Sequence, residues 1–176
     1  MDYYRSSFYC TFLILLFASI VSPGKKDKIV NIIACTCYLF IIFCPENTRN
    51  IRYLDWAITT PILLAIYFEE IDGELPKLFP LIVCVDLAMI SCGYIGGSFF
   101  YVGLLFYLML MWLIYRDSFL FWSFSVVWGM YGVAFMIPNT TTKNMTYNLL
   151  DILSKAAFSA LLQKEKNMFQ LPDEPP

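Results

Sequence analysis

The sequence predicts an all-α membrane protein built as a bundle of seven transmembrane helices, and three observations carry this prediction. Of the 176 residues, 59% are hydrophobic, 18% are aromatic and only 15% are charged. The mean hydropathy is +0.63. The apolar residues are grouped in long runs that short polar clusters separate. This composition excludes an ordinary soluble domain and is typical of a chain that crosses a membrane several times.

Seven apolar runs approach the length of a membrane-spanning helix, which needs roughly 17–25 residues. They lie near residues 8–23, 29–44, 51–70, 77–94, 99–115, 118–137 and 144–163. Together with tight loops they fill the chain, so we expect one seven-helix domain over residues 1–176 and an integral, multi-pass membrane location. The first run has the length of a signal-peptide core, but the preceding MDYYRSS is a poor match to a basic leader. We therefore predict a helix there.

Basic residues gather on one side of the predicted bundle. PGKKDK follows the first run, Lys77 and Arg116 lie in later connections on the same side, and QKEK follows the last run. Because cytoplasmic loops are enriched in Lys and Arg, we predict that the N-terminus is outside and the C-terminus inside. The other side carries the polar connection PNTTTKNMT, with glycosylation tripeptides that begin at Asn139 and Asn144.

Several kinds of site are excluded by composition. The chain has no histidine, which rules out a histidine-based metal site or general base. Its six cysteines lie mostly within the apolar runs, and the spacing of Cys35 and Cys37 fits neither a zinc site nor a redox pair. No glycine-rich phosphate loop is present in the sequence. We therefore expect no metal site, no enzymatic activity and no nucleic-acid partner.

The third run contains polar residues at helical spacing. Arg52, Asp55 and Thr59 are three and four residues apart, so they share one helical face, with Trp56 and Thr60 on the adjoining strip. An ionised Asp inside a membrane needs a cation or hydrogen bonds, which an Arg one turn outward and a Thr one turn inward can supply. The alternative is a structural Arg and Asp pair that only orients the helix.

The last run holds Asp151 and Lys155, four residues apart on one face. A charge at the bilayer centre costs at least ~2.5–3.5 kcal/mol, so such residues are usually paired or functional. Desolvation favours the neutral, nucleophilic amine of a buried lysine, which can form a Schiff base with an aldehyde. Asp55 and Asp151 are both candidate counterions for the protonated form.

At these residues the chain resembles the microbial (type 1) rhodopsins, seven-helix proteins that bind all-trans retinal on a lysine of the last helix. The segments RYLDWAITTPILL and LDILSKAAF carry the resemblance. DLAMISCG in the fourth run and the tyrosine at position 38 are also similar, as is the aromatic spacing of the sixth run, although Gly132 stands where a proline is usual. The compact loops resemble those of the small rhodopsins of giant algal viruses.

The resemblance implies a role for each matching residue. Lys155 would carry retinal, Asp55 would be the primary counterion and proton acceptor, and Asp151 the second counterion. Arg52 would organise an outward water network. The implied pocket and its supports comprise Tyr38, Trp56, Thr60, Asp86, Met89, Gly93, Trp128, Tyr131 and Phe135, with the two tryptophans enclosing the polyene and Thr60 and Asp86 joining the third and fourth helices. The fifth helix leaves Tyr101, Phe106 and Trp112 as alternatives.

Departures from the family pattern bear on mechanism. Proton pumps of the family commonly have an internal proton donor eleven residues beyond the acceptor, and this position is Ile66. Glu69 and Glu70 lie about a turn further, where a solvated helix end is the simpler interpretation. The outer glutamate pair that releases protons in the family has no counterpart, and Lys143 stands near its place.

We therefore expect outward proton transport first, because the set Arg52, Asp55, Thr59, Asp151 and Lys155 is complete. A light-gated cation channel and a photosensory receptor are alternatives, and a structural membrane protein without retinal is a distant one. An acid at position 55 argues against a chloride pump, and the triplet Asp55, Thr59 and Ile66 lacks the sodium-pump pattern. The expected partners are membrane lipids, protons or small cations, and further copies of the chain in a trimer or pentamer.

Overall fold

The computed structural model describes residues 3–22 and 24–158, and within these ranges every regular element is a helix. The seven α-helices and two short helices are α1 (Tyr3–Val21), α2 (Lys25–Phe43), η1 (Pro45–Asn47), α3 (Thr48–Ile71), α4 (Phe79–Ile95), α5 (Phe99–Ile114), α6 (Phe119–Phe135), α7 (Thr140–Asp151) and the π-helix η2 (Ile152–Ala157). The predicted all-α bundle of seven helices is confirmed. The end of the seventh predicted span and the QKEK segment lie outside the described residues.

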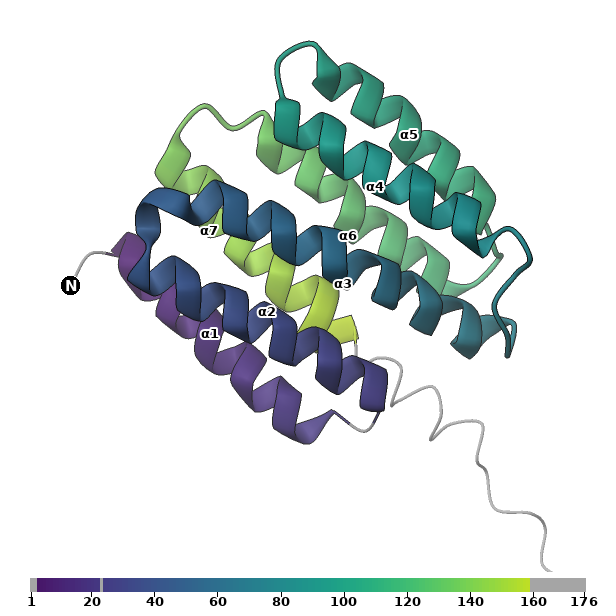
Figure 1. The fold of residues 1–176 in the computed structure, drawn as a ribbon, viewed down its shortest axis with the longest axis horizontal. Coiled ribbons are helices and arrows are strands. Elements are labelled where there is room, and N and C mark those ends of the chain that lie inside the picture. Colours follow the sequence, from purple (N-terminus) through teal and green to yellow (C-terminus); the bar gives the residue numbers. More distant parts are fainter. Residues whose placement is uncertain (1–2, 23, 159–176) are drawn as a thin grey trace, which may run out of the picture.

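The helices run alternately up and down and pack side by side (Figure 1). α1 packs on α2 and α7, α2 on α3, α3 on α4, α4 on α5, and α6 on α7. In Figure 1, α1 and α2 form one edge and α4 and α5 the other, with α3, α6 and α7 between them. This arrangement brings α3 and α7, which carry the charged residues, into the interior of the bundle.

Polar side chains set where several helices begin. Ser118 caps α6 by accepting a hydrogen bond from Phe121 N, and Asn139 caps α7 by accepting one from Thr142 N. These bonds satisfy backbone donors that a helix start leaves unpaired. Because of the second cap, α7 begins at Thr140, four residues before the predicted span. α4 ends at Gly96 and Gly97, whose positive φ values of 74° and 58° are readily adopted by glycine.

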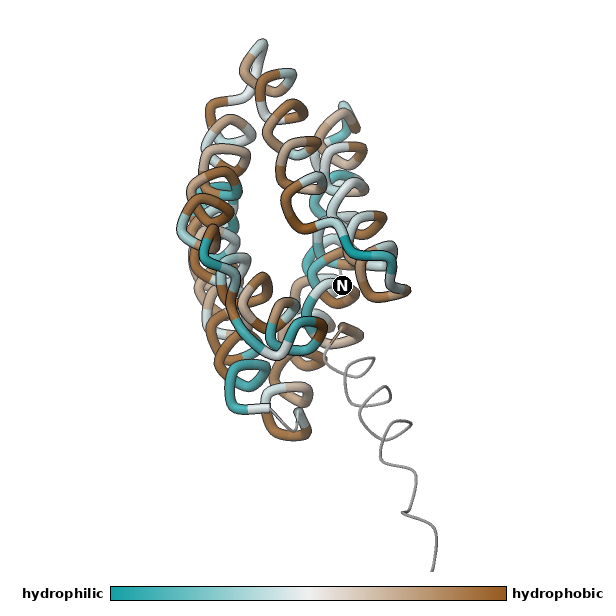
Figure 2. The backbone as a smooth tube through the Cα atoms, turned by 90° about the vertical axis from the view of Figure 1, so that its right-hand side faces the viewer, coloured by the Kyte–Doolittle hydropathy of each residue, from teal (hydrophilic) through white to brown (hydrophobic). Residues whose placement is uncertain are grey.

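The helices turn apolar side chains outward as well as inward. Figure 2 shows hydrophobic residues along most of the helices. Large exposed hydrophobic residues occur on all seven, for example Phe17 on α1, Phe40 on α2 and Trp112 on α5. α1 is 19 residues long and apolar enough to cross a membrane, and α4, α5 and α6 are apolar helices of 16–17 residues. An apolar exterior around buried charges is the arrangement expected of a bundle in lipid.

One end of the bundle, which we call the basic end, carries the α1–α2, α3–α4 and α5–α6 connections. Two ion pairs tie it together: Lys26 of α2 pairs with Glu69 of α3, and Arg116 makes a two-pronged pair with Asp72. The two Arg116–Asp72 contacts measure 3.1 and 2.6 Å. The hydrogen bonds that Arg116 donates to Asp72 raise the pKa of Arg116, so this guanidinium stays charged at any physiological pH. The other end, which carries the α6–α7 connection, is called the opposite end.

Candidate functional site

Four charged side chains meet between α3 and α7 with no more than 2% of each exposed. The Lys155 amine contacts Asp55 Oδ2 directly and lies 3.8 Å from Asp151 Oδ1. Arg52 Nη1 is 3.2 Å from Asp151 Oδ2. The order Asp55, Lys155, Asp151, Arg52 therefore alternates in sign, and its formal charges sum to zero. Because an isolated buried charge is strongly unfavourable, this alternation is what allows the four groups to share the interior.

Two expected partners of the Asp55 carboxylate bind elsewhere. Arg52 pairs with Asp151 across the bundle, since its long side chain reaches from α3 to α7. The Thr59 hydroxyl donates to the backbone carbonyl of Asp55 at 2.8 Å rather than to the carboxylate. A helical threonine commonly makes this bond to the preceding turn. The expectation that Arg52 and Thr59 bind the Asp55 carboxylate was therefore wrong, and Lys155 binds it instead.

The two carboxylates differ in their hydrogen bonding. Asp151 Oδ1 accepts from Trp56 Nε1 at 2.9 Å and from the Tyr131 hydroxyl at 2.7 Å, and Oδ2 accepts from the Tyr38 hydroxyl at 2.6 Å. Among the described residues, Asp55 Oδ1 has no hydrogen-bond partner. Asp151 is thus fixed by three helices in addition to its ion pairs, whereas Asp55 is held by the lysine amine. Asp55 is the carboxylate with acceptor capacity to spare.

Lys155 lies in a π-helical segment, Ile152–Ala157, that continues α7 without a break. A π-helix has a wider turn than an α-helix and is frequent at functional sites. The sequence does not indicate this feature, because a π-helical segment of six residues is too short to change the hydrophobic pattern of the run. Ser154, in the same segment, lies 2.9 Å from the Tyr131 hydroxyl.

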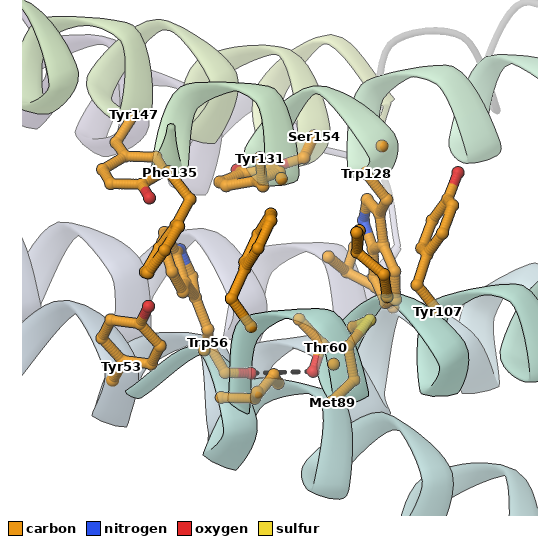
Figure 3. A pocket seen from close by; sticks show the side chains of 18 of the residues that line it. Tyr53, Trp56, Thr60, Met89, Tyr107, Trp128, Tyr131, Phe135, Tyr147 and Ser154 are labelled. Atoms are coloured by element: carbon orange, nitrogen blue, oxygen red, sulfur yellow. Dashed lines mark hydrogen bonds between the residues drawn. The ribbon is translucent and has the colours of Figure 1, made fainter. Parts of the chain in front are cut away.

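A cavity beside Lys155 has an empty volume of about 900 Å³, including the part that opens to the surface. Figure 3 shows aromatic side chains around it, with Trp56 and Trp128 at separate positions along the space. The predicted residues that line it are Trp56, Thr60, Met89, Gly93, Trp128, Tyr131, Phe135 and Lys155. Further lining residues that the sequence did not indicate include Tyr53, Tyr147, Gly129 and Ser154.

Two residues assigned to the pocket by resemblance lie outside its wall. Tyr38 contacts Asp151 and Arg52 through its hydroxyl. Asp86 is fully buried and accepts a hydrogen bond of 2.5 Å from Thr60, so it joins α4 to α3. Both residues contact side chains of the site without lining the cavity.

The fifth-helix candidates do not line the cavity. Tyr101 and Trp112 are 70% and 77% exposed on the outside of the bundle, and Phe106 packs against the apolar core. The α5 residues that line the cavity are Phe100, Gly103, Leu104 and Tyr107. α5 is apolar all round, so its sequence does not indicate which face turns inward.

The helices α5 and α6 approach each other closely at Gly129. A Cβ atom at Gly129 would lie 2.9 Å from the Tyr107 hydroxyl oxygen, so the absence of a side chain lets Tyr107 approach α6. In this position the Tyr107 hydroxyl donates to the carbonyl of Ser125 at 2.8 Å. At Gly132, where the family usually has proline, a Cβ would make an ordinary contact with Leu104 at 3.7 Å.

The fold and the site define a seven-helix membrane protein with a buried lysine, two carboxylates and an aromatic cavity. The family described as "Bacteriorhodopsin-like protein" matches residues 27–166, and the chain belongs to this family. Proteins of this family bind retinal through a Schiff base to a lysine, and the chain is accordingly a microbial rhodopsin and an integral, multi-pass membrane protein. No match was found among curated protein sequences.

Solved structures of several rhodopsins share the fold. The viral rhodopsin OLPVRII has a TM-score of 0.83 and 24% identity, covering 97% of this chain and 100% of that chain. The blue light-absorbing proteorhodopsin from Med12 has a TM-score of 0.80 and 24% identity, covering 94% and 99%. Halorhodopsin, a light-driven chloride pump, has a TM-score of 0.79 and 15% identity, covering 94% and 96%. The fold alone therefore does not decide which ion is transported.

Proposed function

We propose that the chain is a light-driven transporter that moves protons outward, with retinal on Lys155 and Asp55 as the proton acceptor. The observation that carries the proposal is the unequal bonding of the two carboxylates beside the amine. Asp151 is bound by three hydrogen-bond donors as well as Arg52, which keeps it ionised. Asp55 contacts the amine and has acceptor capacity left, so it is the group that can take up a proton.

The residues around Lys155 fit retinal. A flat, apolar chain needs a slot with aromatic walls, an amine at its attachment point and a carboxylate beside that amine. The cavity walls supply Trp56, Trp128 and Tyr131, and Lys155 opens onto the same space. When bound, retinal would supply light-driven isomerisation and a dissociable proton at the lysine nitrogen.

Asp55 receives the proton because its Oδ2 contacts the lysine nitrogen. This transfer neutralises the lysine nitrogen and Asp55 together, so the net charge of the cluster is unchanged and Asp55 no longer attracts Arg52. Arg52 then turns toward the opposite end and favours release on that side. Asp151, fixed by Tyr38, Trp56 and Tyr131, stays in place and keeps a negative charge beside the site.

The proposed direction rests on the charge distribution and on position 66. By the positive-inside rule the basic end is the inner end, so release at the opposite end is outward. Ile66 is 4% exposed and belongs to the apolar core. With an apolar residue at the usual donor position, the proton is taken up directly from the inner solution.

A suspension of cells that express the protein with added retinal tests this proposal. Illumination should acidify the medium, and a protonophore should abolish the change. Under voltage clamp the photocurrent should keep one sign at all voltages. A photocurrent that reverses with voltage would support a cation channel and reject the pump, and visible absorbance without any photocurrent or pH change would support a sensor.

A further inference from the structure

Asn148 is a buried amide of α7 that contacts three helices. It lies one turn before Asp151 and is 2% exposed. Its Oδ1 accepts from Arg52 Nη2 at 2.8 Å and from the Tyr38 hydroxyl at 3.1 Å. Its Nδ2 donates to Ser7 Oγ of α1 at 2.9 Å. The amide is thus oriented at both ends, with its oxygen toward Arg52 and its nitrogen toward α1.

Asn148 completes the enclosure of Arg52. Nη1 of Arg52 is used by Asp151 and the Tyr38 hydroxyl, both at 3.2 Å. The guanidinium carbon also lies 5.2–5.9 Å from the ring centres of Phe8, Tyr38 and Tyr147. The bond from Nη2 to Asn148 is therefore one of the few polar contacts that fix the position of the Arg52 guanidinium.

We propose that Asn148 is a positioning residue that holds Arg52 against the carboxylate pair in the dark, with Ser7 fixing the orientation of its amide. This inference rests on the proposed function, since it describes what restrains the arginine before proton release. A neutral amide suits the task. It binds the guanidinium without adding a charge, so that its hold is weaker than that of a carboxylate and can be broken in each cycle.

The contact between Asn148 and Arg52 has an electrostatic consequence that is measurable in the dark. The charged and titratable groups around Asp55 are Arg52, Lys155, Asp151, Tyr38 and Cys37, with Tyr131 behind Asp151. If Arg52 is no longer held, positive charge is withdrawn from the carboxylates, and Asp55 takes up a proton from a less acidic solution. Protonation of Asp55 changes the visible absorbance, because it removes a negative charge beside the lysine nitrogen.

The test is an acid titration of visible absorbance in the purified, retinal-loaded protein in the dark. In Asn148→Leu, which keeps the side-chain size but removes the hydrogen bonds, we expect the midpoint to rise by about one pH unit, a tenfold change in proton concentration. Asn144→Leu is the matched control: it lies one turn away on α7 and contacts Tyr4 rather than Arg52. Its midpoint should stay where it is in the unmodified protein.

Two further variants keep the inference open to rejection. Ser7→Ala removes the contact that orients the amide, together with the bond from the Ser7 hydroxyl to the Tyr4 carbonyl, and should shift the midpoint in the same direction by a smaller amount. If Asn148→Leu fails to bind retinal, the midpoint of Ser7→Ala tests the inference in its place. Asn148→Asp should hold Arg52 more strongly and slow light-induced proton release, followed with a pH-sensitive dye, about tenfold.

An unchanged midpoint in Asn148→Leu would overturn the inference, and so would an equal shift in Asn144→Leu. In Asn148→Asp, release at the unmodified rate would count against it as well. The titration needs no transport. If the unmodified protein fails to move protons under light, the proposed function is rejected. The dark titration still tests the role of Asn148 in that case.

Discussion

The two halves of the bundle on either side of Lys155 are built differently. Toward the opposite end, a continuous set of polar contacts leads from Asp151 through Arg52 and Asn148 to Ser7. Toward the basic end, the neighbours of the site are apolar and include Ile66, Phe124 and Phe158, all no more than 4% exposed. Buried polar residues in that half include Asp27 and Asn31 near the start of α2 and Ser125 on α6.

This difference suggests how direction is built into a nearly symmetric up-and-down bundle. A proton leaving Asp55 meets hydrogen-bonding groups on one side and a packed apolar layer on the other. Moving a charge through unbonded apolar surroundings is strongly unfavourable, so the apolar side resists leakage in the dark. In the proposed mechanism, the polar side conducts protons only when Arg52 moves. Four substitutions break or sharpen this comparison, and they follow in order of expected effect.

Replacing Lys155 by Ala removes the attachment point shared by both halves. We expect complete loss of visible absorbance after retinal is added. The change also leaves two buried carboxylates with one cation, and breaking a buried pair costs roughly 3–5 kcal/mol. Membrane insertion and thermal stability should therefore be measured with absorbance. Lys143→Ala, at the start of α7, is the control and should remain coloured. Visible absorbance that persists in Lys155→Ala would reject this residue as the attachment site.

Asp55→Asn removes the acceptor while keeping the shape of the side chain. Since a negative charge beside the lysine nitrogen is lost, absorption should shift to the red, and light-driven acidification should fall below detection. Asp86→Asn is a suitable control, because Asp86 is equally buried but contacts Thr60 rather than the lysine. An unchanged spectrum at neutral pH in Asp55→Asn would transfer the counterion role to Asp151.

Ile66→Asp places a carboxylate in the apolar half. In the unmodified protein, recovery of the dark absorbance after a flash should slow about tenfold for each unit that the pH is raised, as direct proton uptake requires. In the variant, recovery should be faster and less dependent on pH. The conservative variant Ile66→Leu should behave as the unmodified protein. If recovery of the unmodified protein is already fast and independent of pH, an internal donor exists, with Glu69 and Glu70 the first to test.

Arg116→Gln breaks the ion pair with Asp72 at the basic end and should have the smallest effect. The pair is partly exposed, so its loss should lower stability by only about 0.2–1 kcal/mol, and added salt should reduce the difference. Because the pKa of Arg116 is raised by its hydrogen bonds to Asp72, the guanidinium keeps its charge throughout the physiological range and loses it only in strong alkali. Thermal unfolding of both proteins at low and high salt measures the effect. A decrease in the free energy of unfolding above about 2 kcal/mol would show that this pair contributes more than an exposed ion pair usually does.

The sequence predicted the elements of the structure better than their mutual contacts. Hydrophobic runs and the spacing of Arg52, Asp55, Asp151 and Lys155 follow from residue order, and the structure brings these four together. Which oxygen Arg52 binds depends instead on the rotation and separation of α3 and α7. For the same reason Thr59 was assigned to the carboxylate, although its own backbone offers a nearer acceptor.

Two regions of the site left little trace in the sequence. α5 is apolar on every face, so the choice of Tyr107 over Tyr101 or Trp112 is made by packing against α4 and α6. Gly129 gives a signal in retrospect, since a glycine inside an apolar helix often marks a close approach. The first run showed only length and apolarity, and Ser7, which contacts Asn148, precedes it in MDYYRSS. A serine near the start of an apolar helix does not reveal its partner on another helix.

The short α4, α5 and α6 have a consequence for the membrane that surrounds the protein. At 1.5 Å per residue, helices of 16–17 residues are about 24–26 Å long, whereas the hydrocarbon core of a typical bilayer is about 30 Å thick. α3, with 24 residues, is about 36 Å long. The α4–α6 side therefore produces hydrophobic mismatch and thins the adjacent lipid, at a fraction of a kcal/mol per Å. Such a protein is stabilised by thin bilayers, which biases the cellular membrane in which it accumulates.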